Sequence, residues 1–148
     1  MLLEVTRLNN RRMARDLAFQ LLFEESLRDD DIEDIIELAK EARDIQPDDY
    51  TCTVVRGTVE HKQEIDDAIG RLAHRRSVSR LSRVVLCCLR LAMFEIDHLD
   101  DIDVSVSINE AVELAKKYST QKEAGYVNGL LGTYVRSKNK PDGSGDAQ

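Results

Sequence analysis

The stretch SINEAVELAKKYSTQKEAGYVNGLL, residues 107–131, decides the fold class of this chain. It holds two Ser/Thr-x-x-Glu motifs, Ser107 with Glu110 and Thr120 with Glu123. This is the spacing of a capping box, in which both side chains bond backbone N–H groups that lack partners at the start of a helix. Apolar residues follow at intervals of three and four: Ile108, Ala111, Val112 and Ala115, then Val127, Leu130, Leu131, Tyr134 and Val135. The stretch therefore predicts two amphipathic helices joined by a short turn, with Glu113 able to pair with Lys117 at i+4.

The first third of the chain repeats the helical period. A first helix is expected over residues 10–27, because apolar side chains recur there at i, i+3, i+4, i+7 and i+8. Residues 29–31 are all aspartate and can cap a second helix, whose apolar stripe includes Ile32, Ile35 and Ile36. Pro47 ends it.

The middle of the chain predicts two further helices. One long helix is expected over residues 48–74, although Gly57 and Gly70 weaken it. The pattern breaks after it, and we place a subdomain boundary near Ser77. Ser82 then precedes one more apolar stripe of helical spacing: Val85, Cys88, Leu89, Ala92, Met93 and Ile96.

Composition agrees with an all-α protein. The 148 residues are 42% apolar and 33% charged, with only two prolines, and this length suffices for one substantial core. The fold class we expect is a compact helical bundle of two packed subdomains, about 10–76 and 77–138. Residues 1–9 should form a mobile arm. Residues 139–148, rich in Gly and Asp, should form a disordered tail.

Charge is unevenly distributed along the sequence. The formal net charge is −7, which by itself disfavours phosphate binding, because that binding depends on Lys and Arg. Residues 24–49 carry twelve acidic and three basic side chains, whereas residues 71–90 carry six arginines and no acid. An acidic protein with one basic face is therefore expected.

Catalytic and metal-binding patterns are weak. His61, His74 and His98 are scattered, and His61 with Glu64 gives only one His-x-x-Glu step, where a di-iron bundle needs paired motifs. The adjacent Cys87 and Cys88 fall on a helix whose apolar stripe includes Cys88, which favours a small buried residue over a redox role. We expect no enzyme, no cofactor and no metal.

The cysteines and the first residues indicate the compartment. Three cysteines without Cys-x-x-Cys spacing suit the reduced cytoplasm. The longest uncharged stretch, residues 125–135, is too short to cross a bilayer, and Glu4 and Arg7 interrupt any signal-peptide core. A cytoplasmic protein with no membrane association is expected.

The basic start of the first helix is the best binding candidate. On an ideal helix Arg11 and Arg15 lie one above the other beside the apolar stripe, and Arg12 projects toward solvent. Guanidinium groups bind phosphates bidentately and stack on bases. A cluster of exposed arginines also suits an ordinary solvated helix face, so both interpretations stay open at this point.

Three segments together resemble the NusB family of transcription antitermination factors. NRRMARDLAFQLLF, residues 10–23, resembles the arginine-rich first helix of the family, and RLSRVVLCCLRLAMFEI, residues 80–96, a later helix. The stretch at residues 107–131 is similar to the family's Ile-Asn-Glu-Ala helix and to its aromatic-Val-Asn-Gly segment, in the same order and spacing. The resemblance covers residues 10–137.

This resemblance implies two helical subdomains and a function in transcription. The protein would recognise boxA-type single-stranded RNA together with the ribosomal protein NusE, as part of an RNA polymerase antitermination complex that supports ribosomal RNA synthesis. Matched by position, Arg11, Arg12 and Arg15 fall in the arginine-rich RNA-binding motif, and Tyr126 takes the place of an aromatic ring beside the RNA. Single-stranded RNA suits such a site, because its splayed bases stack on aromatic rings. Lys116 and Lys122 would extend the basic surface.

Two other functions remain open. The acidic second helix and the basic first one suit a protein-interaction module or a homodimer that binds no specific RNA. An RNA-binding appendage of an RNA methyltransferase is a third hypothesis, which we disfavour because the sequence ends at Gln148 without a catalytic domain.

Overall fold

The computed structural model describes residues 2–73 and 77–139, with side chains described from Asn10 onward. These residues form seven α-helices and one 3-10 turn and contain no strand, which confirms the all-α prediction. The elements are α1 (Leu2–Leu27), α2 (Ile32–Arg43), α3 (Asp49–Glu60), α4 (Lys62–Leu72), η1 (Val78–Arg80), α5 (Arg83–His98), α6 (Val104–Tyr118) and α7 (Gln121–Lys138). None of the helices in the described ranges combines the length and the apolar character needed to cross a membrane.

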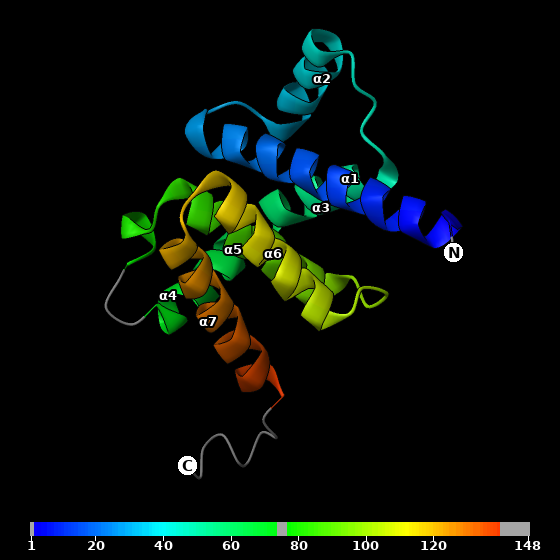
Figure 1. The fold of residues 1–148 in the computed structure, drawn as a ribbon. Helices are drawn as coiled ribbons and strands as arrows, with labels where there is room; N and C mark the ends of the chain where they lie inside the picture. Colours follow the sequence, from blue (N-terminus) through cyan, green and yellow to red (C-terminus); the bar gives the residue numbers. More distant parts are fainter. Residues whose placement is uncertain (1, 74–76, 140–148) are drawn as a thin grey trace.

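The helices pack around α5 (Figure 1). Helices α1 and α3 contact α5 and each other, and α2 adds to α1 and α3. Helices α4, α6 and α7 also contact α5, with α6 and α7 forming an antiparallel pair. Helix α4 contacts α7, so it packs against helices that follow the subdomain boundary expected near Ser77. The two-subdomain division stays a prediction.

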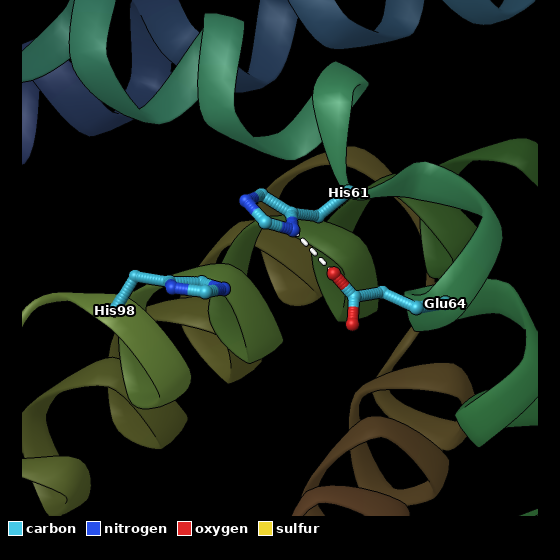
Figure 2. A group of neighbouring side chains, drawn as sticks. All are labelled: His61, Glu64 and His98. Atoms are coloured by element: carbon cyan, nitrogen blue, oxygen red, sulfur yellow. Dashed lines mark hydrogen bonds and ion pairs between the residues drawn. The ribbon is translucent and has the colours of Figure 1, made fainter.

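The long helix expected over residues 48–74 is instead two helices, and that prediction was wrong. Helix α3 ends at Glu60 and α4 begins at Lys62, with His61 at the corner in a non-helical conformation. The ring of His61 packs on that of His98 (Figure 2), at a centroid distance of 4.4 Å. It also packs on the ring of Phe94, at 5.9 Å. Local periodicity continues through the corner, but α3 packs on α1 whereas α4 packs on α7, and one straight helix cannot do both.

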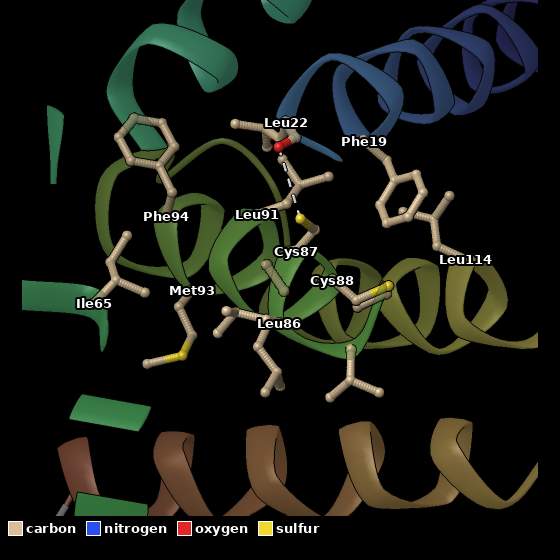
Figure 3. Close-up of a cluster of buried hydrophobic side chains, with 14 of the residues drawn as sticks. Phe19, Leu22, Ile65, Leu86, Cys87, Cys88, Leu91, Met93, Phe94 and Leu114 are labelled. Carbon is tan, nitrogen blue, oxygen red and sulfur yellow. Dashed lines mark hydrogen bonds between the residues drawn. The ribbon is translucent and has the colours of Figure 1, made fainter. Parts of the chain in front are cut away.

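Helix α5 is the centre of the hydrophobic core (Figure 3). All eleven residues from 85 to 95 are buried, because other helices surround α5. Cys87 and Cys88 are fully buried, and the thiol of Cys87 lies 3.7 Å from the carbonyl oxygen of Leu22. The interpretation of Cys88 as a core residue is confirmed. Two charged residues, Arg90 and Glu95, are buried in the same helix.

Capping was predicted correctly at two helix starts and wrongly at a third. Asp31 accepts a hydrogen bond from the backbone N–H of Glu33 at the start of α2, and Thr120 accepts one from the N–H of Glu123 at the start of α7. Ser107 caps nothing, because α6 begins earlier, at Val104, with Asp103 as its N-cap. Ser107 lies inside α6, and its hydroxyl donates to the carboxylate of Glu95, 2.8 Å away.

The first helix extends further toward the N-terminus than the sequence predicts. Helix α1 begins at Leu2 and is therefore longer than the helix expected from Asn10. The mobility expected of residues 1–9 stays a prediction. Of the tail expected at 139–148, Asn139 is the last residue of the described part, and 140–148 lie outside it.

Candidate nucleic-acid interface

The three arginines predicted to bind RNA all lie on α1, but they occupy different environments. Arg11 is half-buried, and its guanidinium carbon lies 4.3 Å from the ring centroid of Tyr50 on α3. A cation stacked on an aromatic face keeps its N–H donors at the edge of the plane, where they can still reach an acceptor. Arg11 is thus held in place without an ion pair being needed to orient it.

Arg12 is the most exposed of the three. Its side chain is 65% exposed, and its Nε and Nη2 atoms donate to the two carboxylate oxygens of Glu110 on α6, at 3.1 and 2.7 Å. The hydrogen bond from Glu110, followed by its negative charge, raises the pKa of Arg12. Arg12 itself faces solvent, whereas the side chain of Glu110 is only 10% exposed and also lies 3.5 Å from Nη1 of Arg15. A phosphate that binds Arg12 in place of Glu110 therefore leaves this carboxylate paired with Arg15.

Arg15 lies in the interior, which corrects the expectation that it stands on an exposed helix face. Its Nε and Nη2 atoms donate to Glu95 at 2.8 and 3.2 Å, and its Nη1 atom lies 3.5 Å from Glu110. Only 5% of the side chain is exposed. Burial acts to lower the pKa of Arg15, but the bond and charge of Glu95 outweigh it, and the net pKa is raised. Arg15 therefore joins α1 to α5 and α6, and its contact with RNA stays a prediction.

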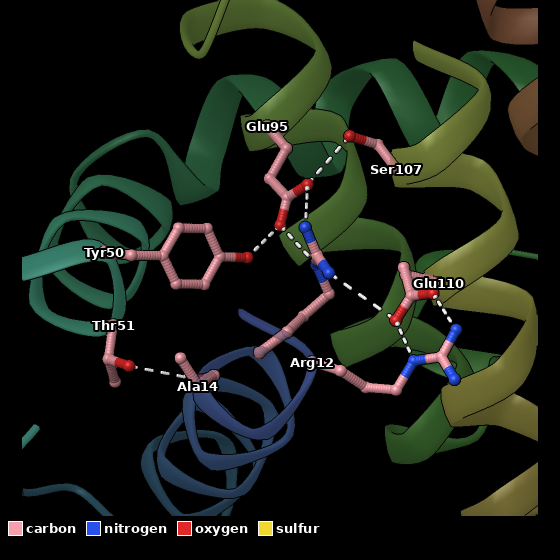
Figure 4. Close-up of polar contacts among 8 residues, drawn as sticks. Arg12, Ala14, Tyr50, Thr51, Glu95, Ser107 and Glu110 are labelled. Atoms are coloured by element: carbon pink, nitrogen blue, oxygen red, sulfur yellow. Dashed lines mark hydrogen bonds and ion pairs between the residues drawn. The ribbon is translucent and has the colours of Figure 1, made fainter. Parts of the chain in front are cut away.

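Glu95 is the centre of this polar cluster (Figure 4). Its fully buried carboxylate accepts hydrogen bonds from Arg15, from the hydroxyl of Tyr50 and from Ser107. Burial, followed by the charge of Glu95, raises the pKa of Tyr50. Sequence reasoning missed Glu95, although one signal was present. It is the only acid among residues 84–96, which are apolar apart from Arg90 and Glu95, and such an acid must either end the buried face or meet a partner.

A groove of about 560 Å³ separates α1 from α6. Its lining carries both signs of charge and some apolar surface: Arg12, Met13, Arg15, Asp16, Leu17, Gln20, Glu110, Glu113, Leu114 and Lys117. Asp16 accepts hydrogen bonds from Lys117, Tyr118 and Gln20. Burial acts to raise the pKa of Asp16, but these three bonds outweigh it and the pKa is lowered. Two ion pairs, Arg12 with Glu110 and Lys117 with Asp16, thus connect the two sides of the groove.

The expected pair of Glu113 with Lys117 is replaced by other pairs. Lys117 binds Asp16 on the facing helix, and Glu113 lies 3.4 Å from the ammonium group of Lys116 instead. Lys117 therefore pairs across to α1 and not within α6. The side chain of Asp16 is only 19% exposed, so leaving its charge without a cation would cost more than leaving exposed Glu113 without Lys117.

Comparison with known proteins identifies the family to which this helical arrangement belongs. The NusB family model matches residues 11–136, which include every predicted RNA-binding residue.

The chain belongs to the NusB family.

Similar NusB proteins are known in sequence and in structure. The transcription antitermination protein NusB of Natranaerobius thermophilus is 43% identical over 136 residues, covering 88% of this chain and 98% of that protein. A crystal structure of the antitermination factors NusB and NusE in complex with dsRNA superimposes with a TM-score of 0.76 at 30% identity, covering 86% and 96% of the two chains. NusB of T. maritima gives a TM-score of 0.76 at 35% identity, covering 85% and 90%.

The remaining predicted residues of this NusB-family chain lie on α6 and α7. Lys116 is exposed in the last turn of α6, and Lys122 is exposed in the first turn of α7. Tyr126, which precedes Val127 in the family's Val-Asn-Gly motif, is half-buried and packs against the core. Helix α6 lies between α1 and α7 in Figure 1, so the helix that carries the arginines and the helix that carries Tyr126 lie on different sides of α6.

Proposed function

We propose that this chain is an RNA-binding transcription antitermination factor that recognises boxA-type single-stranded RNA together with ribosomal protein NusE. It acts within an RNA polymerase antitermination complex and supports ribosomal RNA synthesis. Membership of the NusB family supports the antitermination role, and the related complex of NusB, NusE and dsRNA supports the two partners. The observation that carries the proposal is the pair of adjacent cations on α1, Arg11 and Arg12, which fold packing leaves within reach of a ligand.

The chemistry of the proposed contact follows from their environments. A phosphate takes the place of Glu110 on Arg12, and the guanidinium of Arg11, fixed over Tyr50, binds a neighbouring phosphate or stacks on a base. Arg15 acts as a positioning residue, because its buried pair with Glu95 holds α1 at this angle. Lys116 and Lys122 extend the basic surface, and the accessible part of Tyr126 stacks on a base.

Fluorescence anisotropy with labelled RNA tests this proposal. The arms are a boxA-containing single strand, a scrambled single strand and a duplex of the boxA sequence, each with and without NusE. We expect the boxA strand to bind most tightly, and NusE to increase that affinity. Equal weak binding of all three RNAs, unchanged by NusE, would contradict the proposal.

A salt titration locates the contact on the protein. Each phosphate neutralised on a single strand contributes about 0.7 to the slope of log affinity against log salt concentration. Changing Arg11 and Arg12 together to Ala should therefore reduce the slope by about 1.4. Arg28 follows the other end of α1 and has a side chain that is 43% exposed, so Arg28→Ala is the matched control and should leave the slope unchanged. An equal effect of both variants would place the RNA elsewhere.

A homodimer remains the second candidate because of one exposed apolar residue. Met13 lies between Arg12 and the core stripe of α1 with 71% of its surface exposed, and it borders grooves on both sides of the helix. If it is a dimer contact, light scattering will give twice the chain mass, and Met13→Glu will return the monomer. A monomer at all concentrations eliminates this candidate.

A further inference from the structure

We propose that His61, Glu64 and His98 form a binding site for a divalent transition-metal ion of the zinc type. The three side chains come from separate places in the fold: His61 from the corner between α3 and α4, Glu64 from the first turn of α4, and His98 from the last turn of α5. One donor atom from each of the three lies within 4.8 Å of the other two. The site is separate from the arginine surface of α1 and independent of the proposed RNA function.

The three side chains gather at one place in the fold (Figure 2). The two imidazole rings lie one above the other, with centroids 4.4 Å apart, and the carboxylate of Glu64 lies at the edge of both. Its Oε1 atom is hydrogen-bonded to Nδ1 of His61. A tetrahedral ion with bonds of about 2.1 Å needs donor atoms about 3.4 Å apart. Glu64 is 69% exposed and His98 is exposed. Binding would turn the ring of His98 out of the stack, so that its donor nitrogen faces the ion beside His61 and Glu64.

A third aromatic ring packs against the two imidazoles. The ring of Phe94 packs on His98 at 4.8 Å and on His61 at 5.9 Å. Phe94 can lie there because the facing residue of α3 is Gly57, where an added Cβ would fall 2.1 Å from the phenyl ring. This apolar contact restricts the ring of half-buried His61, which lowers the entropy cost of binding, while His98 is exposed and can turn toward the ion. Asp97, the carboxylate next to His98, is occupied by Tyr134 and Lys138 and does not compete.

The donor set determines which ion fits. Two imidazoles and one carboxylate suit Zn²⁺, Co²⁺, Ni²⁺ and Cu²⁺, whereas Mg²⁺ requires oxygen ligands. Three protein ligands leave a fourth position for water. Coordination through Nδ1 of His61 requires the tautomer with its proton on Nε2. The bound ion would fasten the α3–α4 corner to the end of α5, and it would therefore stabilise the fold.

Isothermal titration of the full chain, prepared without a histidine tag, tests the site with Zn²⁺ and with Mg²⁺. We expect one Zn²⁺ per chain and no heat from Mg²⁺. Glu64→Gln and His98→Gln should each weaken Zn²⁺ binding by about tenfold or more, while Glu41→Gln, an exposed change of the same charge on α2, should not alter it. Unchanged Zn²⁺ affinity in both site variants would overturn the proposal. The rings of His61, His98 and Phe94 would then be a packing cluster only.

Two further measurements guard against misleading results. Circular dichroism of each variant verifies the fold, and Zn²⁺ should raise the melting temperature of the unaltered chain but not of Glu64→Gln. Absorption of bound Co²⁺ should contain d–d bands without a thiolate charge-transfer band. A thiolate band would overturn the proposal, because it would assign the ion to Cys52, Cys87 or Cys88.

Discussion

Arg12 and Arg15 lie three positions apart on α1 but make ion pairs of different energetic weight. Removing Arg15 leaves the buried carboxylate of Glu95 without its cation, so Arg15→Ala should lower the free energy of unfolding by about 3 to 5 kcal/mol. Arg12→Ala removes one of two cations beside Glu110, which keeps Arg15 at 3.5 Å, and should therefore cost less than Arg15→Ala. Urea unfolding of both variants measures the difference.

The same two variants separate stability from RNA binding. Arg12→Ala should weaken RNA binding while leaving the fold intact, whereas Arg15→Ala should affect binding only through the position of α1. If Arg15→Ala proves as stable as Arg12→Ala, the buried pair does not contribute to stability as we infer.

Asp16 should make stability depend on pH in the acid range. Its pKa in the folded state lies below the ordinary value of 3.8, since the bonds from Lys117, Tyr118 and Gln20 outweigh the effect of burial. The stabilisation is therefore fully present above 3.8 and is lost as the pH falls through the lower, folded-state value. Asp16→Asn should be less stable than the unaltered chain at about pH 6, and this difference should shrink at about pH 3.

Urea unfolding at the two pH values measures this effect. Asp34→Asn, an exposed change of the same kind on α2, serves as the control for the general effect of acid. A difference between Asp16→Asn and the unaltered chain that stays constant with pH would rule out the ionised carboxylate as its source.

At the scale of the helix, glycines in α3 and α7 should respond oppositely to alanine. Gly57→Ala would place a Cβ 2.1 Å from the buried ring of Phe94, and such overpacking costs about 1 to 3 kcal/mol. The gain of about 1 kcal/mol in helix propensity does not offset so close a contact. Gly129 has no atom within 4 Å of its added Cβ, so Gly129→Ala should stabilise the chain by about 0.4 to 1 kcal/mol.

Thermal unfolding of the two variants provides the measurement. Equal stabilisation by both would mean that the ring of Phe94 moves aside at no cost, and that the close approach of α3 and α5 at Gly57 is not required.

Sequence reasoning succeeded for helices whose boundaries depend on local chemistry. The caps Asp31 and Thr120 were found because a side chain and a backbone N–H two or three residues later suffice to make them. Ser107 had the same local pattern, but the buried carboxylate of Glu95 required a donor, and no local rule contains that partner. The corner at His61 was missed for the same reason, since partners of α3 and α4 from elsewhere in the chain decide it.

At the scale of the whole molecule, α5 should be the most stable element. It has substantial contacts with α1, α3, α4, α6 and α7, whereas α2 has substantial contacts only with α1 and α3. Opening α5 exposes most of the core, so its amides should exchange with solvent only through global unfolding. Hydrogen exchange followed by mass spectrometry should find α5 slowest and α2 fastest among the helices with described side chains. Similar rates in both would contradict this order.

The position of the proposed RNA surface also belongs to this scale. The net charge of the chain is −7, so only cationic side chains that are not paired with internal carboxylates can attract a phosphate. Arg11 and Arg12 remain accessible to a ligand. Arg15 is instead paired with Glu95, and Arg90 with Asp66, in ion pairs of 2.8 Å with little exposed surface. The number of arginines in the sequence therefore overestimates the number that a ligand can meet.

By itself the sequence determined the all-α class, most helix positions, the buried Cys88 and, through the order of its motifs, membership of the NusB family. These properties depend on neighbours within about one helical turn, or on similarity along the chain, and both can be read from a string of residues. Only the tertiary structure decided that Arg15 is buried while Arg12 is exposed, and that His61, Glu64 and His98 meet. The reason is physical: those outcomes depend on desolvation and on partners tens of residues away, which exist only after the helices have packed.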